Sequence, residues 1–501
     1  MILSAVVRVL LATVFCLGND EAYYYTYALY PDLSHFDHPS MIGWVIQLFS
    51  FNLHFDSELF IRMAAVIGGT MNTWLMYCIG RQLSDELTGW YAALLYTASI
   101  YGFVIVGVFI LPDSPQSVFW LLSILFLMKA FKGEIDKRAK LNFLLASLFM
   151  GLAFMSKYTT AYLWLGMSLF ILSSRRLWLK TSTFYLAQLL LALSLLPTLL
   201  WNAQNGFVSF LFHSGRIGPS SSALTLDHFL TEILGEALYT NPINLVLIAI
   251  AVIAFFRLKG LTFGTEGKLL LMIGLPLVLT FLIASIFQST LPHWNGAGYL
   301  TLLPLAAVWL RSRSESRIPK AILASMGFIL LTISVCTAQI LTGFLPLGSF
   351  GTNKGGQGSS DYSLEVYGWH QLHDEFGALA EKYENKGLMP QGSPIVSYRW
   401  FPAGNYSYYA ARGTNRGVMA AGDTSEIHQF AWTNALQGGF KLNSAAWYIT
   451  SSRDFKPPSE MKALYYGKVS LPDTIAIKRM GKQVYSFFVY RLQDLQWRKY
   501  P

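Results

Sequence analysis

The side chains best suited to chemistry follow the first apolar run of the sequence. Asp20 and Glu21 come directly after that run and precede a row of tyrosines, and the stretch His-Phe-Asp-His-Pro at 35–39 lies in the same loop. A carboxylate in such a position can act as a general base on an acceptor hydroxyl. The alternative is that Asp20 only caps a helix and that Tyr23–Tyr27 form an ordinary interfacial aromatic belt.

Three charged residues in later loops could act on the same substrate. Asp113 lies in Leu-Pro-Asp-Ser-Pro, where it could cap the following helix and also support a base. Lys157 lies between two apolar runs, where an ionisable side chain suggests a functional site, although a lysine can also extend its ammonium to an interface. Arg216 carries a guanidinium, which suits bidentate contacts with a phosphate.

Histidines complete the set of candidates. His213 precedes Arg216 in the same loop, and a single histidine is usually not a metal ligand. His293 and Trp294 open a later loop, either as an interfacial anchor or as part of a pocket for a lipid head group. The sequence contains no phosphate-binding loop, no H-E-x-x-H motif and no dinucleotide fingerprint. The three cysteines all lie in apolar runs, so we expect neither a disulfide framework nor a thiolate metal site.

Apolar segments must position these residues. Of the 501 residues, 53% are hydrophobic and only 13% are charged, against roughly 25% charged in a typical soluble chain. This composition excludes a disordered chain and predicts a polytopic membrane protein. Apolar runs without two-residue alternation indicate helices, so we expect about eleven transmembrane helices. The runs lie at 2–18, 59–80, 90–111, 115–131, 141–156, 159–174, 183–200, 242–256, 268–287, 297–310 and 321–342.

Lysines and arginines predict the orientation of these helices. One alternate set of loops carries sixteen of them, whereas the other set carries only Lys157 and Arg216. The first set is therefore expected in the cytoplasm, with the N-terminus inside and everything after about Gly343 outside. The net charge of +9 follows from this distribution and gives no reason to expect nucleic acid as a partner. The predicted outer loops instead carry ten acids, several of them at helix ends.

The composition changes after the last apolar run. We expect a membrane domain over 1–342, a Gly/Ser-rich linker over 343–360 and a small extracytoplasmic α/β domain over 361–501. Within that domain, helical spacing of apolar residues predicts a helix over 363–386. Short strands are predicted at 394–398, 445–450, 474–478 and 483–491.

Together these motifs resemble the GT-C glycosyltransferases, most of all the protein O-mannosyltransferases and the bacterial lipid A aminoarabinose transferase. The resemblance rests on four segments that occur in the same order as in that family. They are Asp-Glu-Ala-Tyr-Tyr at 20–24, Phe-Asp-His-Pro at 36–39, Pro-Asp-Ser-Pro at 112–115 and the Gly-Leu-Ala run that ends at Lys157. The resemblance covers about residues 1–310 and implies a GT-C-like fold.

The resemblance also implies a role for each matched residue. Asp20 would be the catalytic base, with Glu21 beside it, and Asp113 would support the site. Lys157 and Arg216 match positions that bind the donor phosphate.

Two further matches concern a metal ion and a replaced lysine. Asp37 and His213 match positions that hold a divalent metal in the aminoarabinose branch. That branch has Glu-Lys-Pro-Pro where this chain has Asp-His-Pro-Ser at 37–40, so His38 replaces a phosphate-binding lysine. A histidine can still donate to a phosphate, with a charge that depends on pH.

The leading interpretation is an integral enzyme of the cytoplasmic membrane. It would transfer a sugar, with inversion, from a polyprenyl-phosphate donor to a lipid, glycan or protein acceptor at the outer face. The alternative is a transporter or flippase of lipid-linked glycans, but such proteins place paired charges at mid-membrane and often contain internal repeats. Here the charges cluster at outer helix ends, which favours the enzyme. A binding or sensor protein that acts through its outer domain also stays open.

Overall fold

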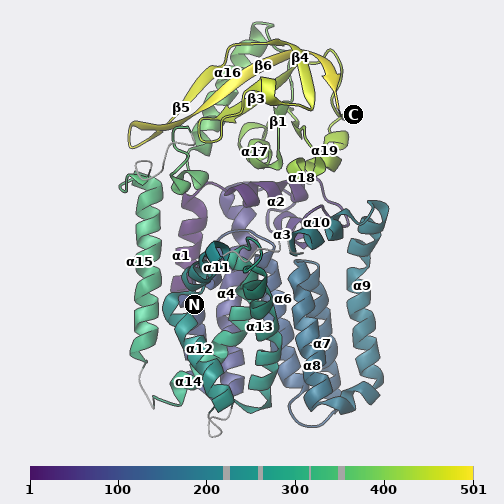
Figure 1. The fold of residues 1–501 in the computed structure, drawn as a ribbon, viewed down its shortest axis with the longest axis vertical. Coiled ribbons are helices and arrows are strands. Elements are labelled where there is room, and N and C mark those ends of the chain that lie inside the picture. The colour runs from purple at the N-terminus through teal and green to yellow at the C-terminus, as the bar shows by residue number, and fades with distance from the viewer. Residues whose placement is uncertain (218–225, 258–262, 315–317, 348–355, 500–501) are drawn as a thin grey trace. The chain divides into compact units, whose positions relative to one another are not determined.

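The computed structural model describes residues 1–217, 226–257, 263–314, 318–347 and 356–499 (Figure 1). The chain divides into two compact units. The first consists of Met1–Ala12 and Pro31–Thr332, and the second of Thr13–Tyr30 and Ile333–Pro501. The second unit therefore contains the predicted C-terminal domain over 361–501, together with residues 333–360 and the segment Thr13–Tyr30 from the start of the chain.

Helices and their connecting turns make up the first unit. Every apolar run predicted to be helical coincides with one of them. They are α1 (Ile2–Val14), α3 (Met41–Phe49), α4 (Glu58–Leu83), α5 (Glu86–Ala98), α6 (Asp113–Ala130), α7 (Lys137–Phe154), α8 (Ala161–Ser174), α9 (Ser182–Gln204), α10 (Val208–Ile217), α11 (Leu226–Thr240), α12 (Pro242–Arg257), α13 (Gly264–Ala284), α14 (Gly296–Arg311) and α15 (Lys320–Thr342), whose last residues belong to the second unit.

Short polar side chains determine where several of these helices begin. Asp85 caps α5 by accepting a hydrogen bond from the Thr88 amide at 2.8 Å, and Asp136 caps α7 through the Ala139 amide at 2.7 Å. The predicted run at 90–111 is not continuous, because α5 ends at Ala98 and a π-helical turn (η1, Tyr101–Ile105) follows. Such turns often occur at functional sites.

Fewer helices than the predicted eleven are both long and apolar enough to cross a membrane. Among the described residues, four helices are long and apolar enough to cross a membrane, namely α4, α9, α13 and α15. Up to six spans result if two bent helix pairs each count as one. Helices such as α5, α6 and α14 are shorter than the ~20 residues that a bilayer requires, so the prediction of eleven spans is not confirmed.

The first unit has a continuous apolar core between its helices. Helix α6 packs against α4 and α7 (Figure 1). Helix α14 packs against α5 and α13. Trp120 of α6 is fully buried, and its indole N–H donates to the Thr301 hydroxyl of α14 at 2.8 Å. This packing holds the first residues of α6, which carry Asp113.

The second unit combines helices with one mixed sheet. Its described elements are α2 (Asn19–Leu29), η6 (Tyr362–Val366), α16 (Trp369–Asn385), β1 (Ile395–Ser397), α17 (Trp400–Asn405), η7 (Tyr406–Ala410), β2 (Val418–Ala420), α18 (Thr424–Ile427), α19 (Phe430–Leu436), β3 (Ala446–Ser451), η8 (Pro458–Glu460), β4 (Leu464–Val469), β5 (Asp473–Arg479) and β6 (Lys482–Arg498). All four predicted strands are present, whereas β2 and β4 are additional to the prediction. The helix predicted over 363–386 is present only from Trp369, because its first residues form the separate turn η6 and Gly368 has a positive φ angle.

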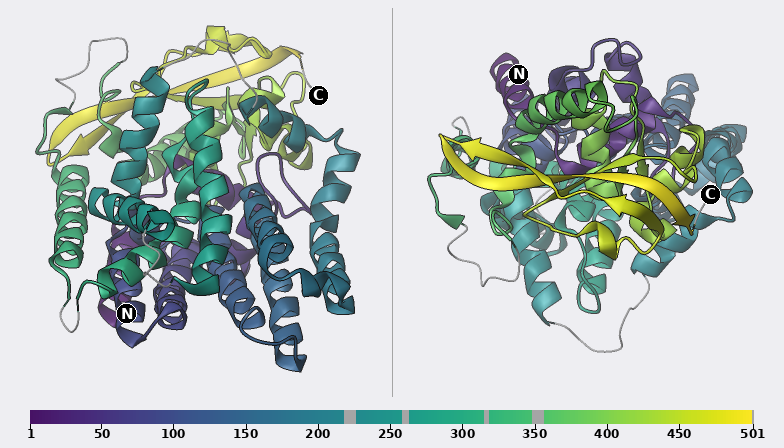
Figure 2. Two further views of the ribbon diagram at one scale, coloured as in Figure 1. Left: turned by 60° about the horizontal axis from the view of Figure 1, so that its bottom comes forward. Right: turned by 90° about the horizontal axis from the view of Figure 1, so that it is seen from above.

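The sheet has the strand order β2-β1-β3-β6-β4, and β5 also pairs with β6. Strand β1 is parallel to both β2 and β3, and β6 is antiparallel to its three partners. The long strand β6 (yellow) pairs with β5 through its first half and with β4 through its second half (Figure 2). Met480 and Gly481 both have positive φ angles, as the tight turn between β5 and β6 requires.

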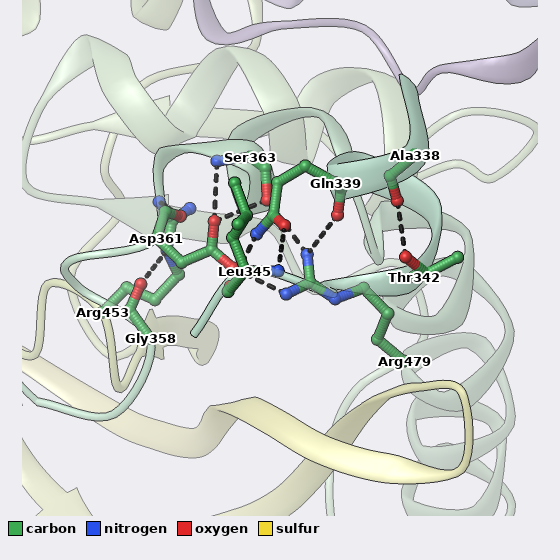
Figure 3. A network of polar contacts seen from close by, with 9 residues as sticks. All are labelled: Ala338, Gln339, Thr342, Leu345, Gly358, Asp361, Ser363, Arg453 and Arg479. Carbon is green, nitrogen blue, oxygen red and sulfur yellow. Dashed lines mark hydrogen bonds and ion pairs between the residues drawn. The ribbon is translucent and has the colours of Figure 1, made fainter. Parts of the chain in front are cut away.

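A buried ion pair joins the end of α15 to this sheet (Figure 3). Arg479 of β5 donates to the Asp361 carboxylate at 2.6 Å, to the Ser363 hydroxyl at 3.0 Å and to the Gln339 carbonyl of α15 at 3.3 Å. Burial raises the pKa of Asp361, but hydrogen bonds from Ser363 and Arg479 outweigh it, so the pKa lies below its usual value.

The predicted linker at 343–360 lies partly outside the described residues, because 348–355 are not among them. Its last residues belong to the second unit, within which the Arg453 guanidinium donates to the Gly358 carbonyl at 3.1 Å.

Candidate functional site

The centre of the site in the first unit is a buried ion pair. Lys157 donates to both carboxylate oxygens of Asp113, at 2.9 and 2.8 Å, and the Tyr101 hydroxyl donates to one of them at 2.8 Å. The side chains of Lys157 and Asp113 are only 7% and 5% exposed. Charges at this depth are tolerated only when they are paired, so each side chain holds the other in place.

Local structure explains how these three residues meet. Asp113 is the first residue of α6, Tyr101 begins the π-helical turn η1, and Lys157 follows the end of α7. Gln116, one turn along α6, donates from its amide to the hydroxyls of Thr159 and Thr160, both at 2.9 Å. This contact fixes the turn that carries Lys157 against the start of α6.

The loop at 31–40 is held beside this ion pair by α9 and α10. Trp201 donates from its indole to the Asp32 carboxylate at 2.8 Å, and His213 donates from Nε2 to the backbone carbonyl of Asp37 at 2.6 Å. At the other end of the loop, the Met41 amide donates to the Met155 carbonyl at 3.2 Å. Residues from three distant parts of the sequence therefore meet near Lys157.

His38 lies among the charged groups of the site. Burial, with smaller contributions from the neighbouring His213 and Lys157, lowers the pKa of its imidazole to about 3 against the opposite effect of Asp37 and Asp113. His38 is therefore neutral at physiological pH, and the expectation that its charge changes with pH near neutrality does not fit this environment. A neutral imidazole still has one N–H that can donate to a phosphate oxygen.

Asp37 and His213, the two residues of the predicted metal site, are in contact through the hydrogen bond from Nε2 of His213 to the Asp37 carbonyl. The His213 ring lies 5.8 Å from the His38 ring and 5.3 Å from the Tyr158 ring. Because Nε2 of His213 donates to Asp37, only Nδ1 could ligate a metal. In the described part of the chain, no group of three or more His, Cys, Asp and Glu side chains is arranged to hold a metal ion. The metal therefore stays a prediction.

Of the other predicted residues of the first unit, the structure describes the side chains of His293 and Trp294 but not that of Arg216. His293 lies in a short helical turn (η4, Pro292–Asn295) and interacts electrostatically with Asp113. Trp294 packs against the Phe281 ring at 5.4 Å. Arg216 is in α10, but its side chain lies outside the described part of the structure, so its phosphate-binding role stays a prediction.

Sequence reasoning did not single out a second buried group beside η4. Glu232 and Glu236 are one turn apart on α11 and are 1% and 2% exposed. Thr290 donates to Glu232 at 2.8 Å, Tyr299 donates to Glu236 at 2.7 Å, and the Asn295 amide contacts both carboxylates. The sequence places both among the ten acids of the predicted outer loops, and their spacing on one helix face is the signal that could have indicated this group.

Asp20 and Glu21 belong to the second unit. Both lie in the first turn of α2, where the Glu21 carboxylate accepts a hydrogen bond from the Gly18 amide at 2.9 Å. Glu21 is buried, and its carboxylate holds the amide of Gly18, which is the N-cap residue of α2, whereas Asp20 is exposed at the surface of the helix. Asp20 is therefore not needed as the cap, and the catalytic roles of both acids stay predictions.

The tyrosines that follow Asp20 anchor α2 within the second unit. Tyr23 contacts Trp400 of α17, with ring centroids 5.1 Å apart, and its hydroxyl accepts a hydrogen bond from the Gln429 amide at 3.0 Å. Tyr25 packs edge-on against Tyr408 at 5.0 Å. These contacts explain why the segment that carries Asp20 belongs to the C-terminal unit.

Known proteins are similar to this chain in sequence and in fold. Residues 37–201 match the profile of a family described as dolichyl-phosphate-mannose-protein mannosyltransferase. The lipid A galacturonosyltransferase RgtD of Rhizobium johnstonii is 24% identical over 319 residues, which cover 63% of this chain. The matched region spans 66% of that relative's length, slightly less than two thirds.

The fold is similar to two crystal structures of ArnT from Cupriavidus metallidurans. The structure bound to undecaprenyl phosphate has a TM-score of 0.61 and the apo structure one of 0.62, each at 13% identity. Both similarities cover 97% of this chain and 96% of ArnT. The predicted resemblance to GT-C glycosyltransferases is thus confirmed. The matched profile contains Asp37, His38, Asp113 and Lys157 but not Asp20.

Proposed function

We propose that this protein is a membrane glycosyltransferase that uses a polyprenyl-phosphate sugar as donor. The observation that carries the proposal is the buried Asp113–Lys157 pair, with Tyr101 and the neutral His38 beside it. This group lies within residues 37–201, the region that matches the mannosyltransferase profile. The relative RgtD is named as an enzyme that acts on lipid A, and one ArnT structure contains undecaprenyl phosphate, which supports a lipid-linked donor.

The ion pair suits a phosphate group because the ammonium of Lys157 has one more hydrogen-bond donor than Asp113 engages. It has three N–H donors, and two are directed to the Asp113 oxygens. The third can donate to a phosphate oxygen while Asp113 keeps the ammonium in place. In this proposal Lys157, Arg216 and His38 bind the donor phosphate and stabilise the negative charge that grows as it leaves. Asp113 acts as a positioning residue.

The proposed reaction is an inverting displacement. Asp20 removes the proton from the acceptor hydroxyl, and the acceptor oxygen forms a bond to C1 of the sugar. The bond from C1 to the phosphate oxygen breaks, and its electron pair leaves with the polyprenyl phosphate. An acceptor phosphate would need no base, because it is already deprotonated at neutral pH.

A divalent metal is part of the proposal only as an addition at the phosphate. Asp37 and Nδ1 of His213 could supply two ligands, which fits an ion that is completed by substrate phosphate oxygens rather than by a closed protein site. Such an ion would neutralise charge on the leaving phosphate.

The location follows from the distribution of lysines and arginines. We propose that the N-terminus is in the cytoplasm, that the second unit is outside it, and that the acceptor is a lipid, glycan or protein reached at the outer face of the cytoplasmic membrane.

Two measurements test the proposal. Mass spectrometry of envelope glycolipids and glycoproteins, with and without the gene, should reveal a sugar that is missing in the deletion strain. Purified protein should bind undecaprenyl phosphate, and Lys157→Gln should weaken that binding about tenfold or more, as expected for the loss of a charge-assisted hydrogen bond. An unchanged envelope together with no binding of undecaprenyl phosphate would refute the proposal.

A further inference from the structure

A cavity of the first unit lies at the ends of α4 and α6 and the start of α7, away from the candidate site. Its volume is about 720 Å³. The wall combines the ring of Trp74 on α4 with four cationic side chains, Arg81, Lys129, Lys132 and Arg138. These cations come from α4, from the end of α6 and the turn after it, and from the start of α7, so the packing of the three helices brings them together.

None of the four cations forms an ion pair with a carboxylate among the described residues. Arg311, by contrast, is paired with Asp85 at 2.7 Å. Two acids, Glu134 and Asp136, also line the cavity, and the Asp136 carboxylate accepts the N-cap hydrogen bond of α7. Four cations around one cavity with two acids leave an excess of positive charge, and that excess is not neutralised by any described contact.

The other described contacts of these side chains do not neutralise them either. The Lys129 ammonium lies 4.9 Å from the centroid of the Phe126 ring, and the Arg81 guanidinium lies 5.7 Å from that of Tyr77. An aromatic ring attracts a cation but carries no net charge. In addition, Nε2 of Gln82, which lines the same cavity, is buried without a hydrogen-bond acceptor in the described part of the chain. The cavity thus presents unused cations and an unused donor.

The remaining wall indicates which kind of anion fits. Trp74, Cys78 and Leu125 supply apolar surface, and Trp74 is 47% exposed on α4, one of the helices apolar enough to cross a membrane. A soluble anion would gain nothing from these side chains, whereas a lipid places its phosphate among cations and its chains against apolar helix faces.

We propose that this cavity binds the phosphate head group of an anionic phospholipid. The cavity lies among the basic loops that are predicted to be cytoplasmic, so the lipid would come from the inner leaflet. The proposal does not depend on the transfer reaction, because none of these residues belongs to the candidate site.

The test compares two pairs of substitutions that remove the same charge. Lys129→Gln/Lys132→Gln neutralises two cations of the cavity, and Lys137→Gln/Lys140→Gln neutralises two exposed lysines on α7 that do not line it. Native mass spectrometry of the purified full-length protein would measure retention of phosphatidylglycerol and of phosphatidylcholine. Inorganic phosphate is added in a separate arm as the soluble source of the same group.

The wild type should retain phosphatidylglycerol in preference to phosphatidylcholine. The cavity variant should bind phosphatidylglycerol about 30-fold more weakly, whereas the control variant should bind it about as well as the wild type does. Three results would overturn the proposal: equal losses in both variants, equal retention of the zwitterionic lipid, or displacement of the lipid by millimolar inorganic phosphate. Because the control carries the same charge change, a general surface effect cannot imitate the expected pattern.

Discussion

Substitutions of Asp113 and Lys157 should show whether their ion pair only stabilises the fold or also contributes to binding of the donor phosphate. Asp113→Asn keeps the shape of the side chain but leaves the ammonium of Lys157 buried without its counter-charge. Removing one partner of a buried pair destabilises a protein by about 3–5 kcal/mol. With side chains 7% and 5% exposed and two short hydrogen bonds between them, this pair belongs to that class. Lys157→Met should have a similar cost.

The double variant Asp113→Asn/Lys157→Met contains no buried charge at this position. We expect its free energy of unfolding to be no lower than that of either single variant, because the two losses share one cause and are not additive. Unfolding by SDS in mixed micelles, followed by tryptophan fluorescence, would measure this. Arg311→Gln is the control, since its ion pair with Asp85 is 29% and 40% exposed and should contribute less than about 1 kcal/mol.

Stability and donor binding should respond differently in the double variant. If Lys157 holds the donor phosphate, the double variant regains stability but still binds undecaprenyl phosphate about tenfold or more weakly. Recovery of both properties would mean that the pair is structural only and would remove Lys157 from the proposed site. Additive losses of stability would refute the inference that the two charges compensate each other.

Further predictions concern the base, the imidazole, the second unit and the topology. Asp20→Asn should lower the rate of sugar transfer about 10²–10⁴-fold without unfolding the protein, and near-normal transfer by this variant would refute the role of Asp20 as base. Glu21→Gln should also retain the fold, because the glutamine keeps an oxygen acceptor for the Gly18 amide. Because the pKa of His38 is about 3 in the folded protein and about 6.5 when unfolded, the unfolded state binds more protons between these values. Stability should therefore be complete above pH 6.5 and fall by up to about 1.4 kcal/mol per pH unit below it, and His38→Gln should remove that slope in acid unfolding. Arg479→Met should destabilise the second unit by about 3–5 kcal/mol in thermal unfolding, because it leaves the Asp361 carboxylate buried and unpaired. A reporter that is active only in the cytoplasm should stay silent at the C-terminus, and activity there would contradict the predicted topology.

The sequence predicted helices better than it predicted membrane spans. Long apolar runs have one stable structure in lipid, so their helical state could be inferred with their approximate limits. The break at Ala98 could not, because the run at 90–111 stays apolar while a π-helical turn interrupts it. In the second unit β2 has only three residues, too few to show a two-residue period, and β4 ends in exposed residues.

The membership of Asp20 in the second unit could not be inferred from its neighbours along the chain. Tyr23 and Tyr25 have the composition of an interfacial belt, and only their partners Trp400 and Tyr408, nearly four hundred residues away, show that they are packing residues. Likewise, the charge state of His38 depends on burial and on His213, which no local pattern reveals.

Glu232 and Glu236 illustrate why charge alone is a weak guide to a site. Both belong to the predicted outer loops, where acids are expected to be exposed, yet they are buried and accept hydrogen bonds from Thr290, Tyr299 and Asn295. Asn295 is the last residue of η4, the turn that also contains His293. The next residue, Gly296, lies against the Tyr101 ring, and a Cβ added to Gly296 would lie 2.1 Å from atoms of that ring. The backbone must therefore lack a side chain at this point for Tyr101 to reach Asp113. A Gly296→Ala substitution, which adds one methyl group far along the sequence from Asp113 and Lys157, should displace Tyr101 and weaken binding of undecaprenyl phosphate. The same substitution at Gly327, where no atom lies within 4 Å of the added Cβ, should leave binding unchanged. Equal binding by the two variants would show that the contact between Tyr101 and Asp113 is not required.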